Sequence, residues 1–153
     1  METSYVLEEK ELVLWNLYIH YSDFSDGGRN KLVGQIFEIK NPDTNKFVIE
    51  YISEEILKDS NFDKISGCDH FNGKRLWVYN NKVPIFLQER LPSMRRPDLP
   101  KLLEEIGLEH FDIYEYLKRT NGVCSDNRLF VHTDKYIPNF KNEWLHNISL
   151  RIN

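Results

Sequence analysis

Hydrophobic and polar residues alternate along the first half of the chain with the two-residue period of β-strands. Residues 12–21 are rich in Leu, Val, Trp, Tyr and Ile, which suit a pleated, half-buried surface, and the Asp-Gly-Gly segment at 26–28 ends this stretch. Residues 32–40 and 46–52 predict a β-hairpin, because the Asn-Pro-Asp-Thr-Asn segment between them has the composition of a turn. One alternating set is expected on the first strand of this hairpin: Val33, Gln35, Phe37 and Ile39.

Two short elements are expected after the hairpin. Ser53 can cap a helix over residues 54–58, whose first turn holds two glutamates that the helix dipole favours. Residues 61–73 are polar and rich in turn-forming types, and the Leu-Trp-Val-Tyr run at 76–79 predicts a short strand.

The second half of the chain changes to helical periodicity. Residues 84–91 predict a short helix that Pro92 ends, because proline lacks an N–H group and clashes with the preceding turn. Asp98 is placed to cap a helix over residues 99–106, with Gly107 at its C-cap. The apolar face of this helix is expected to consist of Leu99, Leu102, Leu103 and Ile106.

A further helix is predicted to begin after residue 112. Asp112 and Glu115 have the spacing of a capping box, and Asn121 with Gly122 forms a stop signal. The buried face of this helix is expected to consist of Ile113, Tyr116 and Leu117.

The order of the elements favours one fold class. Residues 128–132 and 144–152 are predicted strands, so strands come first, helices next and strands again at the end. We therefore expect a single α+β domain over residues 1–153, with an antiparallel sheet and three or four short helices packed on one side. A chain of 153 residues can bury the hydrophobic core of such a domain without disulfides or metal.

Composition and charge narrow the class of protein. Hydrophobic residues make up 41% and charged residues 29%, an ordinary globular mixture, and the net charge of −4 argues against a non-specific nucleic-acid binder. Cys68 and Cys124 form no CxxC pair, the N-terminus lacks a signal-peptide pattern, and no apolar stretch approaches the roughly 20 residues of a membrane span. We expect a cytoplasmic protein with no membrane segment. Frequent Lys, Asn, Ile and Asp point to an AT-rich bacterial or phage genome.

No set of residues has the pattern of a familiar catalytic or metal site. No two of the five histidines have the i, i+4 spacing of a metal-binding helix, and the Cys-Asp-His cluster at 68–70 lacks a second pair of ligands. The chain contains no GxSxG or SxxK motif, no Walker lysine and no GxGxxG loop. Cys124 is more typical of a small core residue than of a nucleophile. We therefore expect no catalytic residue, no metal and no cofactor.

Three arginines lie in the proline-containing segment of residues 90–97, just before a predicted helix: Arg90, Arg95 and Arg96. Arginine side chains and free backbone N–H groups can hold phosphate or carboxylate, so one interpretation is an anion or partner contact. The other is structural, with the arginines pairing with Asp98, Glu89 or backbone carbonyls to fix a turn. We favour the structural interpretation and keep the contact as the alternative.

Aromatic residues are a second candidate for partner contact. They make up 13% of the chain, more than a small core comfortably hides, and Tyr and Trp are enriched at interface hot spots. Most of them are expected in the core, with one or two marking a partner surface. The candidate binding residues, for a protein or an anion, are Arg90, Arg95, Arg96, Trp77, Tyr79 and Arg119.

Short motifs between residues 32 and 131 resemble a known family, and the resemblance implies that these residues form the core of the domain, with strand extensions at its N- and C-terminal ends. They resemble the N-terminal subdomain of HipA-type toxin kinases, and they are similar to the region that precedes HIRAN domains in some bacterial proteins. The residues that carry the resemblance are Leu32-Val33-Gly34-Gln35-Ile36, Phe47-Val48-Ile49-Glu50-Tyr51, Pro84-Ile85-Phe86, Arg90-Leu91-Pro92, Arg96-Pro97-Asp98, Leu102-Leu103, Gly107-Leu108, Phe111-Asp112, Leu117, Arg119-Thr120-Asn121-Gly122, Asp126 and Phe130-Val131.

The resemblance implies a binding role. The HipA-type subdomain is not the kinase core: it packs against a kinase or, as a separate small protein, neutralises a HipA-like toxin. This chain has no kinase Gly-rich loop, no HRD-like catalytic loop and no DFG motif, so kinase catalysis would belong to a partner.

Three functions are consistent with these observations. The first is a non-catalytic protein-binding or regulatory module, with toxin–antitoxin-like control of a HipA-like kinase partner. The second is a nucleic-acid-associated accessory module of a HIRAN-type protein. The third is a phage or mobile-element inhibitor of a host defence enzyme. The oligomeric state is left open.

Overall fold

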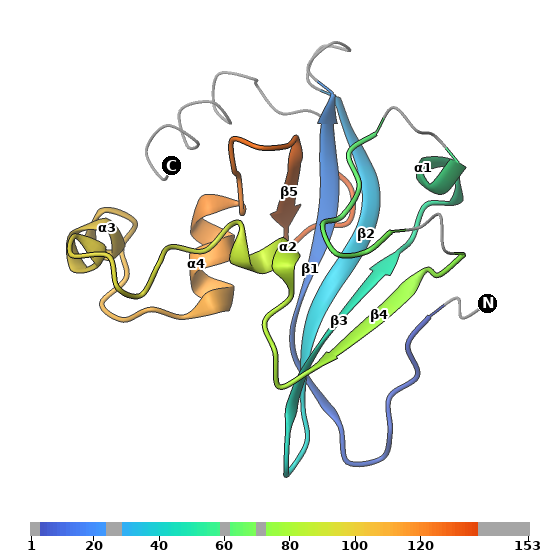
Figure 1. Cartoon of the computed structure of the whole chain (residues 1–153), viewed down its shortest axis with the longest axis horizontal. Coiled ribbons are helices and arrows are strands. Elements are labelled where there is room, and N and C mark those ends of the chain that lie inside the picture. The colour runs from blue at the N-terminus through green and yellow to red at the C-terminus, as the bar shows by residue number, and fades with distance from the viewer. Residues whose placement is uncertain (1–3, 24–28, 59–61, 70–72, 138–153) are drawn as a thin grey trace.

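The computed structural model describes residues 4–23, 29–58, 62–69 and 73–137 (Figure 1). None of the helices among these residues has the length and hydrophobicity that a membrane-spanning helix requires. The elements in chain order are β1 (Leu12–Asp23), β2 (Arg29–Lys40), β3 (Asn45–Tyr51), α1 (Glu54–Lys58), β4 (Leu76–Asn80), α2 (Ile85–Gln88), α3 (Leu99–Glu105), α4 (Ile113–Thr120) and β5 (Leu129–His132).

The strands form one antiparallel sheet in the order β4-β3-β2-β1-β5. The first four strands are neighbours in chain order, whereas β5 returns to the far side of β1, where Val131 lies opposite Ile19. The predicted α+β fold with an antiparallel sheet is therefore confirmed. The predicted strand over residues 144–152 lies outside the described residues.

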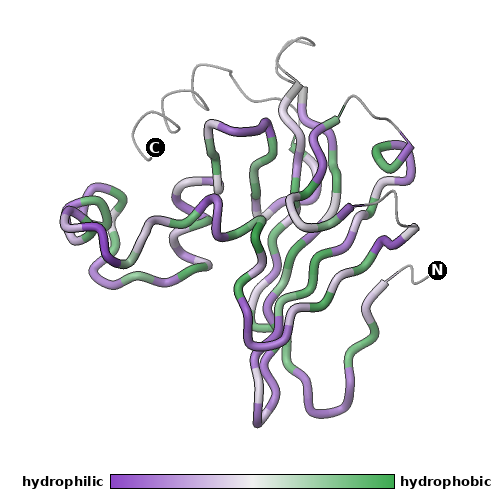
Figure 2. Tube along the Cα trace, in the orientation of Figure 1, coloured by the Kyte–Doolittle hydropathy of each residue, from purple (hydrophilic) through white to green (hydrophobic). Residues whose placement is uncertain are grey.

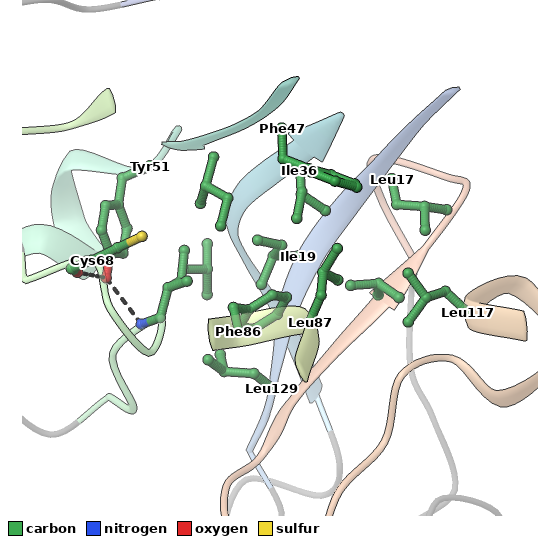
Figure 3. Close-up of a cluster of buried hydrophobic side chains, with 14 of the residues drawn as sticks. Leu17, Ile19, Ile36, Phe47, Tyr51, Cys68, Phe86, Leu87, Leu117 and Leu129 are labelled. Atoms are coloured by element: carbon green, nitrogen blue, oxygen red, sulfur yellow. Dashed lines mark hydrogen bonds between the residues drawn. The ribbon is translucent and has the colours of Figure 1, made fainter. Parts of the chain in front are cut away.

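Helices α1, α2 and α4 contribute to one hydrophobic core on a single face of the sheet (Figure 3). Helix α3 lies beyond α4 and away from the strands (Figure 1). The helical side chains in this core pack against β1, β2 and β3, so burial of apolar surface holds the two layers together. They are Ile56, Phe86, Leu87 and Leu117, and their strand partners include Leu17, Ile19, Ile36 and Ile49.

A buried tyrosine ties the segment after α1 to the sheet. The hydroxyl of Tyr51 donates to the carbonyl of Cys68 at 2.8 Å and accepts from the amide of Ile65 at 3.0 Å (Figure 3). Both bonds satisfy backbone groups that would otherwise be buried without a partner. Burial of Tyr51 raises the pKa of its hydroxyl, so this side chain remains a neutral structural bridge.

Local side-chain bonds form the predicted hairpin turn and the predicted cap of α1. The amide oxygen of Asn41 accepts from the backbone N–H groups of Asp43 at 3.0 Å and Thr44 at 2.7 Å. The hydroxyl of Ser53 accepts from the N–H group of Ile56 at 3.2 Å. Both predictions are confirmed.

The two later helices begin differently from each other. Asp112 accepts from the N–H group of Glu115 at 2.9 Å, whereas the Glu115 side chain pairs with Arg119, so only half of the predicted capping box forms. The prediction that the Asp98 side chain caps α3 is wrong. Its carboxylate is held by Arg96 at 2.5 and 3.1 Å and makes no capping bond.

A glycine follows the end of α3 and an asparagine follows the end of α4. Gly107 after α3 and Asn121 after α4 have positive φ angles of 81° and 55°, as the stop signals predicted. Helix α2 is shorter than the predicted residues 84–91. It ends at Gln88, and Glu89 and the buried Arg90 lie in the turn that follows.

The expected alternation along β2 fails at Val33, and a β-bulge is the reason. Ile19 lies opposite Gly34 and His20 opposite Leu32, so the residue between them, Val33, has no partner across β1. Because of this extra residue, Val33 and the later members of the set point to opposite faces of the sheet. Val33 joins the main core with Ile36, while the two later members of the predicted set, Phe37 and Ile39, pack with Val48 in a separate cluster.

Candidate protein-binding surface

Glu11 closes the N-terminal segment into a loop. Its carboxylate is buried, accepts from the hydroxyl of Tyr5 at 2.7 Å and from the N–H group of Glu8 at 2.9 Å, and pairs with the ammonium of Lys46 at 2.6 Å. We call these four residues the N-terminal clasp. It fixes residues 5–11 against β3.

The ion pair of the clasp favours the charged forms of both Lys46 and Glu11. The hydrogen bond from Lys46 to Glu11 raises the pKa of the lysine. Burial alone would raise the pKa of Glu11, but the bonds from Lys46, the Glu8 backbone and Tyr5 lower it overall. Lysine and glutamate are therefore both ionised in the folded protein at neutral pH.

Five aliphatic side chains on this loop and the start of β1 are exposed. We call them the aliphatic patch: Val6, Leu7, Leu12, Val13 and Leu14, of which Val6 is 80% and Leu12 69% exposed. The chain before β1 makes a U-shaped turn with a polar tip between two hydrophobic stretches (Figures 1 and 2). Exposed aliphatic residues this close together in the chain make this ordered segment a candidate surface for contact with another protein.

A second bulge in β1 turns part of the patch outward. Val13 lies opposite Ile39 and Trp15 opposite Glu38, which leaves Leu14 unpaired and 49% exposed. Trp15 itself is buried. Its indole N–H donates to Glu38 at 3.0 Å and its ring stacks on Tyr114 of α4 at 5.5 Å between centroids.

Arg90 belongs to the protein interior. It is 2% exposed, lies over the ring of Phe86 at 4.0 Å, donates to the carbonyl of Phe86 at 3.0 Å, and bonds to Glu89 and Asn127. Burial lowers the pKa of its guanidinium, although the nearby Cys124 and Glu89 oppose that effect. Arg90 thus joins α2 to the segment before β5, in keeping with the structural interpretation of this arginine.

The other candidate arginines lie near the surface around α3 and α4. Arg95 is exposed, Arg96 holds Asp98, and Arg119 pairs with Glu115 along α4. The pairing with Asp98 raises the pKa of Arg96. Two of the three guanidinium groups are therefore already engaged by carboxylates of the same chain.

The candidate aromatic residues lie on β4, the edge strand of the sheet that is farthest from α3 and α4 (Figure 1). Trp77 meets the ring of Tyr51 edge-on at 5.7 Å, and the hydroxyl of Tyr79 donates to the carbonyl of Gly67 at 3.2 Å. Both rings are half-buried against the main core. The six candidate residues therefore do not form one site.

The described residues contain no cluster of histidine, cysteine and acidic side chains that could hold a metal ion. Both cysteines are buried, and burial raises the pKa of the Cys68 thiol to about 11 although the bond with Tyr79 opposes it. A thiol with that pKa is almost entirely protonated at neutral pH and is a poor nucleophile.

Two open grooves are formed by described residues. One, of about 470 Å³, lies beside Phe47 at the β2–β3 turn, and the other, of about 530 Å³, lies beside Phe62. Neither groove is lined by Cys68, Cys124 or His132.

No family model, no curated protein and no solved structure matches the chain.

The aliphatic patch was not among the candidates from the sequence, yet the sequence contains its signal. Leu12, Val13 and Leu14 are three consecutive apolar residues, and successive side chains of a strand point to opposite faces. With Trp15 directed into the core, at least one member of such a run must point away from it.

Proposed function

We propose that this protein is a non-catalytic, cytoplasmic protein-binding module that docks on a partner protein through the aliphatic patch. The observation that carries the proposal is the exposure of five aliphatic side chains on a loop held in place by the N-terminal clasp. A flexible loop could fold such residues inward, whereas this clasp keeps them at the surface.

The chemistry of the patch suggests what the partner surface offers. Aliphatic side chains bind to an apolar hollow, and the exposed Glu8 and Glu9 at the tip of the turn favour basic residues at its rim. In the narrower form of the proposal, which rests on the resemblance of residues 32–131, the partner is a HipA-like kinase under toxin–antitoxin-like control. A host defence enzyme is the alternative partner.

A variant of the patch tests this proposal. We expect Val6→Ser combined with Leu12→Ser to weaken binding to a purified HipA-like kinase by at least about tenfold, because both side chains are more than two-thirds exposed and would lose burial at the interface. Met94→Ser is the matched control, since Met94 is 54% exposed but lies outside the patch. The readout is the dissociation constant from calorimetry.

Three outcomes would count against the proposal. One is the absence of binding to such a kinase and to host defence enzymes alike. Another is an equal loss in the patch and control variants. The third is binding to short DNA that falls steeply with salt and depends on Arg95, Arg96 and Arg119, which would favour the nucleic-acid alternative.

A further inference from the structure

Strand β4 forms one edge of the sheet (Figure 1). Two backbone bonds fix which of its groups face β3: the N–H of Asn81 donates to the carbonyl of Asn45 at 2.8 Å, and the N–H of Tyr51 donates to the carbonyl of Arg75 at 2.9 Å. In an antiparallel ladder the bonded residues alternate. Trp77 therefore pairs with β3, as does every second residue on either side of it.

The intervening residues of β4 direct their backbone groups away from the sheet. These residues are Leu76, Val78 and Asn80. Within the described part of the chain, no backbone hydrogen bond reaches their outer N–H and C=O groups. The side chain of Val78 is 41% exposed as well. A row of unpaired backbone groups is a template on which another extended chain can pair.

Two lysines flank this edge. Lys74 precedes β4 and Lys82 follows it, both are exposed, and neither lies within ion-pair distance of a carboxylate among the described residues. Positive charge at both ends of an open edge selects the chain that can pair there.

The charges disfavour a second copy of this chain as the occupant. Two β4 strands pairing antiparallel about Val78 would bring Lys74 of each copy towards Lys82 of the other, just beyond the ends of the paired strands. Like charges brought close together repel each other. An extended segment with acidic residues at both ends would gain two opposite-charge pairs in the same register.

We propose that β4 accepts an extended segment of a partner protein as a sixth strand, with backbone bonds to Leu76, Val78 and Asn80 and acidic residues against Lys74 and Lys82. The inference deepens the proposed protein-binding function, on which it rests, but it uses a different surface from the aliphatic patch. The two surfaces are neighbours, because Tyr5 of the clasp and Leu76 of β4 pack against the same buried cluster.

Amide exchange in the free protein tests the geometry. We expect the N–H groups of Leu76, Val78 and Asn80 to exchange at least about tenfold faster than those of Trp77 and Tyr79, which pair with β3. Equal protection of both sets would mean that the edge is already covered, and would overturn the inference.

A synthetic peptide tests the occupant. The probe is acetyl-Asp-Glu-Val-Thr-Val-Thr-Val-Glu-Asp-amide, and the control peptide carries lysine in place of its acidic residues. At low salt we expect the acidic peptide to bind at least about tenfold more tightly than the control, and to slow exchange at Leu76, Val78 and Asn80. The Lys74→Glu/Lys82→Glu variant should reverse that preference.

Val78→Pro separates edge pairing from other modes of binding. Proline removes the outward N–H of residue 78 and costs no bond to β3, so the sheet should keep its melting temperature within a few degrees while peptide affinity falls at least about tenfold. Val78→Thr keeps the N–H and should bind like the wild type. Unchanged affinity in Val78→Pro, or no saturable binding of the acidic peptide, would overturn the inference.

The two proposals can fail separately. Val6→Ser with Leu12→Ser should leave peptide binding at β4 unchanged, because these residues belong to the aliphatic patch. Loss of kinase binding alone would therefore concern the proposed function, and loss of peptide binding alone would concern the edge.

Discussion

At the scale of single residues, Glu11 decides how the N-terminal segment is held. Glu11→Ala would leave the ammonium of Lys46, whose side chain is 13% exposed, without its counter-charge. We expect the free energy of unfolding to fall by about 2 kcal/mol at neutral pH, measured by urea denaturation.

A double variant shows whether that loss comes from the unpaired charge. Glu11→Leu with Lys46→Met removes both charges and should recover at least half of the stability lost in the single variant. A double variant as unstable as Glu11→Ala would contradict this account. Glu9→Ala, at an exposed position of the same loop, should have little effect.

His20 makes stability depend on pH. It is almost fully buried, stacks on Phe130 and bonds to the carbonyl of Asp134, and burial lowers the pKa of its imidazole to about 4. Its ordinary pKa is 6.5, so the folded state binds fewer protons than the unfolded state between these values. The stability it contributes is complete above pH 6.5 and is lost as the pH falls towards 4.

Comparison with His20→Gln measures this contribution. Between about pH 7 and about pH 5 the wild type should lose about 1 to 2 kcal/mol more unfolding free energy than the variant, which has no imidazole to protonate. Urea denaturation at both pH values gives the difference. Parallel losses in the two proteins would show that His20 does not titrate as described.

Gly34 is required by the approach of two strands. A Cβ atom at this position would lie 2.2 Å from the carbonyl oxygen of Glu50, a backbone atom that cannot move independently. Gly34→Ala should therefore cost about 2 to 3 kcal/mol by thermal or urea unfolding. At Gly73 no atom of the described residues lies within 4 Å of an added Cβ and the φ of +77° opposes alanine, so Gly73→Ala should cost about 1 kcal/mol.

At the scale of elements, two aspartates at helix starts have different roles. Asp112 caps α4 through the N–H group of Glu115, whereas Asp98 before α3 makes no such bond. Asp112→Ala should lower the unfolding free energy by about 1 kcal/mol, whereas Asp98→Ala, which breaks only an exposed pair with Arg96, should have little effect. Equal losses in urea denaturation would contradict the difference in capping.

Elements whose limits depend on local chemistry could be predicted from the sequence. The turn after β2, the cap of α1 and the stop after α4 each involve residues a few positions apart. The face reversal in β2 could not be predicted, because the bulge at Val33 arises from the pairing of two long strands. Sequence alternation alone cannot show where one strand has an extra residue.

The contacts of the candidate residues also divide into those formed by neighbours in the sequence and those formed by distant residues. Arg96 pairs with Asp98, two positions away, as the structural interpretation suggested. The burial of Arg90 depends on Asn127, which is 37 positions away and reaches it only through the fold. The aliphatic patch likewise depends on the contact between Glu11 and Lys46, which brings distant segments together.

At the scale of the whole molecule, β1 joins local and distant parts of the chain. It pairs with β2, which follows it directly, and with β5, which comes last among the described strands. Closing the β1–β5 pair requires a loop of about 110 residues, and contacts of such separation tend to form late in folding.

Folding kinetics can test that order. We expect Asn41→Ala, which weakens the hairpin turn, chiefly to slow folding, and Val131→Ala, in the core of β5, chiefly to speed unfolding. Stopped-flow measurements across a range of urea concentrations separate the two rates. A slower folding rate in Val131→Ala with unchanged unfolding would reverse the proposed order.

The N-terminal clasp also has a consequence for the thermodynamics of binding. Because Glu11 and Lys46 already hold the loop, its residues lose little conformational entropy when a partner covers them. An unclasped loop would have to be ordered during association, at a cost of about 1 kcal/mol or more for each backbone residue that becomes fixed. Glu11→Ala should thus weaken partner affinity without altering any aliphatic contact, and the loss should be found in the entropy of binding.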